Sequence, residues 1–447
     1  MDFELFKEKL FTEAKKAGFD ECEIYYLDRE SLSLNVYQNE VEKYNLNNTF
    51  GLSFRGKING KIGYSYTEIL DQDVIFMLVK NAKDGALSIE HDDVQFIYEG
   101  DKEYKDIDCY IEALDNVKSE DLISLALDME KECKKQCDKV VNFGGCGIGY
   151  GKSNYGIINS KGLNLKNRNN SLTAYVVPII KDKDEKYDGM GYVVANSLEE
   201  VKPSELAKQG LDEALSRIGG RSISSGKYKI IINNEAMVSL IGTFSSIFNA
   251  EQAQKGLSLL KGKEGEIIAS KVLTLIDDPH LKDGFATTGF DDEGVATFKK
   301  EIISNGKLNT LLHNLKTAYK AGIKSTGNGF KGSYASPVGV SSTNFYIKPG
   351  EKTLGEICKK INNGLLITEF AGLHSGASAI TGDFSLAAKG FMIENGKKSF
   401  PVEQITVAGN FFTLLKDIEE VGSDLKFPMS SIGCPSVIVK ELSVAGK

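Results

Sequence analysis

Hydrophobic residues recur at helical spacing in some stretches of the chain and at strand spacing in others. Phe3, Phe6, Leu10 and Ala14 repeat every three or four residues, which predicts an amphipathic helix that ends at Gly18. The same spacing predicts helices at 71–83, 119–137 and 203–217. Strand-like segments are predicted at 23–27, 31–37, 49–54, 61–66, 139–149, 155–159, 163–166 and 172–180.

Near the middle of the chain, a short apolar strand at 230–232 leads directly into an apolar helix. Asn233 and Asn234 follow the strand, and asparagine is a favoured helix N-cap. Large apolar residues then repeat at helical spacing and predict one buried face, formed by Met237, Leu240, Ile241, Phe244, Ile247 and Phe248. The other face carries small residues that let another backbone approach closely, namely Ser239, Gly242, Thr243 and Ser246. No His, Cys or acid occurs between Ala236 and Asn249.

Two Asn-Gly pairs, at 305–306 and 395–396, lie between strand-like flanks and predict tight hairpin turns. A helix is expected at 314–321, with strands at 337–347 and 436–442. The Gly/Ser-rich run 219–226 is the predicted domain boundary. We therefore expect an α+β protein with an N-terminal α/β-sandwich-like domain at 1–220. The expected C-terminal domain, 227–447, is rich in mixed and antiparallel sheet with a few helices.

Composition narrows the classes of protein. A chain of 447 residues is long enough for two or more domains, and 41% hydrophobic residues is ordinary for a globular protein. The net charge of -8 weighs against general binding to nucleic acid or to anionic membranes. No apolar run approaches the roughly 18 to 20 residues that a membrane helix needs. Seven dispersed cysteines fit reduced thiols, so we expect a cytoplasmic protein.

Several short motifs suggest chemistry but fit it poorly. The run from Gly145 to Ser153 ends like a phosphate-binding loop, yet the first required glycine is Cys146 and an extended segment follows. Alternate glycines there favour a closely packed strand face. The acid clusters at 277–278 and 291–293 lack the spacing of an EF-hand and are expected to be solvated turn residues.

The glycine-rich segment 371–385 contains His374 and Ser375 side by side. A catalytic base must approach a serine hydroxyl from across the site, so adjacent His and Ser do not suit a nucleophile pair. We expect this loop to contact a substrate or a neighbouring subunit. Zinc ligands are also not indicated, because His91, His280, His313 and His374 are far apart and Cys133 and Cys137 have no neighbouring His.

Long stretches of the chain resemble the TldD/PmbA family, whose members are also labelled modulators of DNA gyrase. The matching segments follow in order along nearly the full length. They are KGLSLLKGKEGEIIASKVLTLIDDP (255–279), GFDDEGVATFKKEIISNGKLNTLLHNLKTA (289–318), STGNG (325–329), TGDFSLAAKGFMIENGKKSFPVEQITVAGN (381–410) and PSVIVKELSVAG (435–446). A weaker match is NSKGLNL (159–165).

This resemblance implies a subunit of a cytosolic zinc metalloprotease built from two related chains. In the TldD type, a His-Glu-x-x-x-His helix holds zinc with its histidines and uses Glu as general base. Alignment on the KGLSLLKGKEGE segment puts that window at 241–246, where Ile241, Gly242 and Ser246 stand in this chain. The chain therefore resembles the TldE (PmbA) type, which lacks the motif. Cys434 lies within the final strand motif, so the role of the family's zinc cysteine is not carried over.

The resemblance implies no catalytic residue and no metal in this chain, with zinc in a TldD-type partner. The expected assembly is a heterodimer with that partner, or a homodimer, acting on peptides and small unfolded proteins. The residues expected to contact substrate or partner are His374, Ser375, Gly376, Asp383 and Ser385. Two other functions stay open, an autonomous hydrolase with a site that the sequence does not reveal and a peptide-binding protein without turnover. No contact with nucleic acid or membrane is expected.

Overall fold

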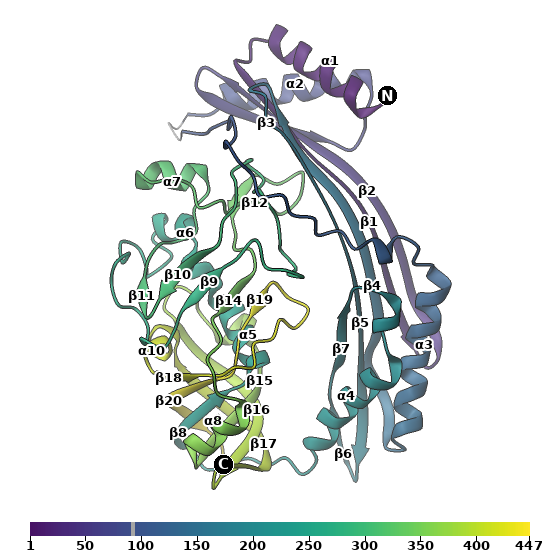
Figure 1. Cartoon of the computed structure of the whole chain (residues 1–447), viewed down its shortest axis with the longest axis vertical. Helices are drawn as coiled ribbons and strands as arrows, with labels where there is room; N and C mark the ends of the chain where they lie inside the picture. Colours follow the sequence, from purple (N-terminus) through teal and green to yellow (C-terminus); the bar gives the residue numbers. More distant parts are fainter. Residues whose placement is uncertain (91–93) are drawn as a thin grey trace.

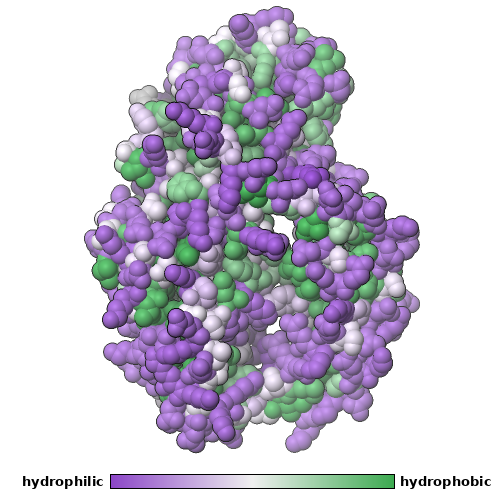
Figure 2. Space-filling view, in the orientation of Figure 1, coloured by the Kyte–Doolittle hydropathy of each residue, from purple (hydrophilic) through white to green (hydrophobic). Residues whose placement is uncertain are grey.

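The protein, described here by a computed structural model, consists of a long curved sheet and a β-rich C-terminal body that lies beside it (Figure 1). The structure describes residues 1–90 and 94–447. His91 therefore lies outside the described residues. The two parts contact each other near both ends of the sheet, and Figure 2 shows openings through the molecule between these contacts.

The first sheet has seven strands in the order β3-β2-β1-β4-β5-β6, with β7 also paired to β5. These strands are β1 (Glu21–Tyr37), β2 (Glu40–Ile58), β3 (Lys61–Thr67), β4 (Val140–Asn159), β5 (Asn164–Asp182), β6 (Glu185–Asp188) and β7 (Gly191–Ala195). Several are longer than predicted, because the segments 23–27 and 31–37 form one strand and the segments at 139–149 and 155–159 form another. The polar stretch Asp28–Glu30 interrupts the apolar pattern without interrupting the pairing of β1 with β2 and β4.

Four helices cover one face of this sheet in two pairs. They are α1 (Phe3–Lys16), α2 (Gln72–Leu87), α3 (Ser119–Gln136) and α4 (Pro203–Ser216), with short 3-10 turns at Glu112–Leu114 and Leu198–Glu200. The first pair packs on Ile24 and Leu52, and the second pair packs on Leu34 and Ala174. The opposite face looks toward the C-terminal body, and one of its rows contains Ser33, Gly149, Thr173 and Val194.

The C-terminal body contains three sheets, with strand orders β11-β10-β9-β14-β19, β12-β13 and β17-β16-β15-β8-β20-β18. The strands are β8 (Gly226–Ile232), β9 (Leu275–Asp277), β10 (Lys300–Ser304), β11 (Lys307–Leu308), β12 (Gly329–Lys331), β13 (Val338–Val340), β14 (Phe345–Ile347), β15 (Gly364–Ala371), β16 (Asp383–Glu394), β17 (Lys397–Asn410), β18 (Ile418–Val421), β19 (Ile432–Gly433) and β20 (Val437–Ala445). The helices are α5 (Asn234–Phe244), α6 (Ala250–Gln254), α7 (Leu315–Ala321), α8 (Leu354–Ile361), α9 (Leu373–Gly376) and α10 (Phe411–Lys416).

Both predicted hairpins are confirmed. Asn305 and Gly306 have φ values of 47° and 84°, and Asn395 and Gly396 have φ values of 52° and 72°, as a type I′ turn requires. These turns join β10 to β11 and β16 to β17. The mixed α+β class that we expected is therefore confirmed.

The predicted helix over 236–249 is divided into α5, a 3-10 turn (Ser245–Phe248) and α6. Asn249 ends the turn and caps α6, because its side chain accepts hydrogen bonds from Glu251 N and Gln252 N. The apolar face of α5 is buried as predicted, within the largest core cluster of the C-terminal body. Phe244 stacks on Phe411 with ring centroids 4.3 Å apart.

Candidate functional site

Helix α5 presents the window at which the resemblance places the zinc motif. Its N-cap, Asn233, accepts a hydrogen bond from Ala236 N at 2.8 Å. Ile241 is buried in the core, Gly242 is half-buried against Ile432, and Ser246 is exposed. The window therefore offers zinc neither an imidazole nor a carboxylate, and its residues do not fit this metal.

The hydroxyl groups on the outward face of α5 donate hydrogen bonds to the backbone of the same helix. Ser239 Oγ donates to Glu235 O at 3.1 Å, and Thr243 Oγ1 donates to Ser239 O at 2.9 Å. Because these hydroxyl donors are already bonded, few unbonded polar groups on this face would lose hydration when another surface packs against it. It matches the small-residue face that the sequence predicted.

The second predicted site, the segment 373–385, lies against α5. Its first residues form the short helix α9, which contacts α5, and Phe384 meets Phe244 edge to face at 6.4 Å. His374 and Ser375 are exposed, and Ser375 Oγ donates to Gly372 O at 3.4 Å. The fold thus brings the two regions that the sequence singled out to one place.

Three other residues of this segment were also expected to contact a substrate or partner. Asp383 and Ser385 are exposed at the start of β16, and Asp383 Oδ1 accepts a hydrogen bond from Asn410 Nδ2 at 2.9 Å. Gly376 is packed tightly, because a Cβ atom there would lie 2.5 Å from Ser385 O. Gly376 is therefore required by the backbone, and it offers no side chain to a ligand.

The expectation that the two acid clusters are solvated is wrong, whereas the turn at the second cluster is confirmed, since Asp291 Oδ1 accepts a hydrogen bond from Glu293 N at 3.0 Å. Asp277 and Asp291 are fully buried. Asp277 accepts hydrogen bonds from Lys300 Nζ at 2.9 Å, Asn328 Nδ2 at 2.9 Å and Thr343 Oγ1 at 2.9 Å. Long-range partners compensate the buried charge, and none of these partners is adjacent in sequence.

A second buried cluster of charges joins the sheet to the C-terminal body. Arg55 Nε on β2 donates to Glu23 Oε1 on β1 at 2.8 Å, and the Arg55 Nη2 atom contacts the same oxygen. Asp292 Oδ2 accepts from Lys331 N at 2.8 Å, and Glu293 Oε2 accepts from Leu315 N at 2.7 Å. Sequence reasoning missed this cluster, because its members come from distant parts of the chain.

Burial in this cluster shifts several pKa values. Loss of hydration raises the pKa of Asp292 to about 6 and the pKa of Glu293 to about 6. Burial also lowers the pKa of Lys331 to about 7. Each shift is opposed by neighbours, since the Lys331 backbone N–H favours the Asp292 carboxylate and the Arg55 guanidinium favours the Glu293 carboxylate. All three pKa values therefore lie close to neutral pH.

At the other end of the sheet, side chains again bridge the two parts. Tyr192 on β7 donates through its hydroxyl group to Glu235 Oε1 at 3.0 Å, and Lys426 Nζ donates to the same oxygen at 2.6 Å. Arg217 at the end of α4 pairs with Glu369 on β15 at 2.9 Å. These side-chain bridges and the buried cluster around Arg55 connect the sheet to the C-terminal body at opposite ends of the sheet. A hollow lies between the two parts.

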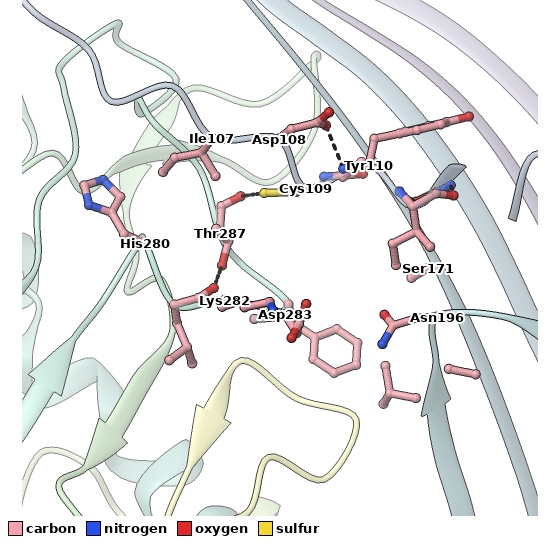
Figure 3. Close-up of a pocket in the computed structure, with 18 of the residues that line it drawn as sticks. Ile107, Asp108, Cys109, Tyr110, Ser171, Asn196, His280, Lys282, Asp283 and Thr287 are labelled. Atoms are coloured by element: carbon pink, nitrogen blue, oxygen red, sulfur yellow. Dashed lines mark hydrogen bonds between the residues drawn. The ribbon is translucent and has the colours of Figure 1, made fainter. Parts of the chain in front are cut away.

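A cavity of about 510 Å³ occupies part of this hollow. Its walls are the open face of β5 and β7, the connecting segment at 105–111 and the loop at 280–287 (Figure 3). Cys109 Sγ donates to Thr287 O at 3.4 Å and Thr287 Oγ1 donates to Leu281 O at 2.6 Å, so the loop and the connecting segment are tied together. Figure 3 shows Ser171 and Asn196 on the sheet side and Lys282 and Asp283 on the loop side.

The remaining motifs have structural roles. The run from Gly145 to Ser153 lies inside β4 and no helix follows it, so it is a packed strand as predicted. Cys434 is fully buried, and burial raises the pKa of its thiol. Within residues 1–90 and 94–447, no group of three or more His, Cys, Asp or Glu side chains is arranged to hold a metal ion. In the same residues, no helix is long and apolar enough to cross a membrane.

The fold and the domain sequence together define a class of metallopeptidase-like protein. Domain 1 of the PmbA/TldA metallopeptidases matches residues 22–86, their central domain matches 112–218 and their C-terminal domain matches 225–446. The chain belongs to the PmbA/TldD metallopeptidase family.

Relatives match over almost the whole chain. Metalloprotease PmbA of Escherichia coli O157:H7 is 28% identical over 439 residues, which cover 96% of this chain and 93% of that protein. A Metalloprotease TldD homologue of Buchnera aphidicola is 27% identical over 267 residues, which cover 56% of this chain and 55% of that protein. A crystal structure from Thermotoga maritima, of a protein named for modulation of DNA gyrase, has a TM-score of 0.92 and 34% identity, covering 99% of this chain and 100% of that one.

Proposed function

We propose that this chain is the non-catalytic, TldE/PmbA-type subunit of a cytoplasmic zinc peptidase and that it pairs with a zinc-bearing TldD-type chain. The observation that carries the proposal is the outward face of α5. At the window where the resemblance places two zinc histidines and a general base, this chain has Ile241, Gly242 and Ser246. Glycine and neutral hydroxyl groups neither bind zinc as imidazoles do nor take a proton from a zinc-bound water.

The same face suits contact with another subunit. Its hydroxyl groups are bonded within the helix, and the exposed His374 and Ser375 lie on the neighbouring α9. Small residues let two backbones approach closely, so a partner helix fits there without displacing large side chains. We propose that α5 and the segment 373–385 contact the TldD-type partner and complete its substrate cleft.

The match to known proteins supports the same assignment. Similarity to a PmbA protein covers 96% of this chain. The substrates of the proposed complex are peptides and small unfolded proteins, which would reach the partner's zinc through the cleft between the chains.

Co-purification of this chain with a zinc-bearing relative tests the proposal. Ser239→Arg places a long cation on the α5 face, and we expect it to abolish co-purification while the variant remains folded. Thr12→Arg on α1 is the matched control, because Thr12 Oγ1 also bonds four residues back, to Glu8 O at 2.8 Å, on an exposed helix face. Equal recovery of the complex with both variants would contradict the proposed interface.

A further inference from the structure

The outer edge of strand β7 has an unused pairing position. The strand pairs with β5, and none of the described strands pairs on its other side. Along an antiparallel edge, the N–H groups of alternate residues point to the same side. Tyr192 N donates outward to Gln209 Oε1 at 3.2 Å, and Asn196 N donates to Glu200 Oε2 at 2.8 Å. Val194 lies midway between them, so its backbone N–H and C=O groups also point outward.

Val194 differs from these two neighbours because no side chain caps it. Among residues 1–90 and 94–447, no side chain or loop backbone bonds to the Val194 N–H or C=O groups. Unpaired N–H and C=O groups on a strand edge are a template for another extended chain. The edge thus offers one donor and one acceptor, flanked by two positions that the protein has already capped.

Strand β7 also borders the cavity described above. Val194 and Asn196 line it, and the loop at 280–287 forms the facing wall. Val194 is 37% exposed and Phe285 on the loop is 39% exposed, so both offer apolar surface in a lining that also contains polar side chains. The volume of about 510 Å³ is within the range of roughly 300–1,000 Å³ that is usual for ligand pockets.

We propose that the β7 edge binds an extended peptide segment, which adds to the sheet as a further strand within this cavity. The proposal rests on the proposed function, because the bound peptide would be part of the substrate of the complex. Main-chain hydrogen bonds would bind peptides of many different sequences. Val194 and Phe285 would favour an apolar peptide side chain beside them.

Peptide binding by the isolated chain tests this site. The probe is a fluorescein-labelled decapeptide that alternates valine with threonine, and fluorescence anisotropy measures its Kd. Val194→Pro removes the outward N–H at an edge, where proline is tolerated, and we expect at least about tenfold weaker binding. Val194→Thr keeps the N–H and the branched shape, and we expect binding within about threefold of wild type. Equal Kd values for the two variants, or no binding by the wild type, would overturn the proposal.

Amide hydrogen exchange provides a second measurement that needs no variant. Adding the decapeptide should slow exchange at Val194 N–H, while exchange at buried amides of β4 stays the same. Unchanged exchange at Val194 would overturn the site even if Val194→Pro failed to fold. The two proposals fail separately. Loss of peptide binding in the isolated chain contradicts the edge site alone, and failure to co-purify with a zinc-bearing relative contradicts the subunit assignment.

Discussion

Lys331 Nζ on β12 donates to Ser53 Oγ on β2 at 2.9 Å, across 278 positions of sequence. The same ammonium lies 5.1 Å from the Tyr25 ring centroid and 4.8 Å from that of Tyr64. One side chain from the C-terminal body therefore enters the face of the N-terminal sheet. The charges of Lys331 and Asp292 therefore affect the stability of this contact between the sheet and the C-terminal body.

The stability of this contact should depend on pH through Lys331. The pKa of Lys331 is lowered from 10.5 to about 7 by burial. Between these values the unfolded chain binds a proton that the native chain does not, so the free energy of unfolding rises with pH. Relative to Lys331→Met, we expect the wild type to gain about 1–2 kcal/mol between pH 7 and pH 9 in urea denaturation. A difference between the two proteins that does not change with pH would contradict this account.

The buried pair of Glu23 and Arg55 should be costly to break. Arg55→Met leaves the Glu23 carboxylate buried without its guanidinium partner, and we expect a loss of about 3–5 kcal/mol in the free energy of unfolding. The double variant Glu23→Gln/Arg55→Met removes both charges and should recover part of that loss. Urea denaturation measures all three proteins. A single variant that loses less than about 1 kcal/mol would show that the charge is not buried as described.

Glycine in the window of α5 should be replaceable. A Cβ atom on Gly242 would lie 3.5 Å from Ile432 Cδ1, which is an ordinary contact. Gly242→Ala should therefore raise the free energy of unfolding by about 1 kcal/mol through helix propensity. Gly210→Ala on α4 is the control, since its Cβ would lie 2.8 Å from Pro178 Cδ. Thermal denaturation should show a gain for the first and a loss for the second, and a loss at Gly242 would mean that close packing already requires the glycine.

The segment 373–385 should affect the complex rather than the fold when its exposed residues are changed. His374→Ala and Ser375→Ala should change the free energy of unfolding by less than about 0.5 kcal/mol. We expect each to slow peptide cleavage by the complex about fivefold, the effect of losing roughly 1 kcal/mol at an interface. Gly376→Ala is a poor probe, because its Cβ would lie 2.5 Å from Ser385 O. Unchanged cleavage with both exposed variants would remove this segment from the mechanism.

Features set by neighbouring residues could be predicted from the sequence, and features set by distant residues could not. The turn at Asn395-Gly396 and the buried face of α5 follow from local backbone preference and helical spacing, and both were predicted. The turn at Asp291 was predicted, and its side chain accepts from Glu293 N, but its burial was not, because that depends on Gly329 N at 2.8 Å, which is 38 positions away. The open position at Val194 was also hidden, since it depends on which neighbours Gln209 and Glu200 happen to cap.

The metal content of the chain, purified alone and then together with a zinc-bearing relative, tests the central claim most directly. We expect no stoichiometric zinc in the isolated chain, and about one zinc per heterodimer together with chelator-sensitive peptide cleavage. Stoichiometric zinc bound to the isolated chain would contradict the account, because the window at Ile241, Gly242 and Ser246 provides no ligand for it.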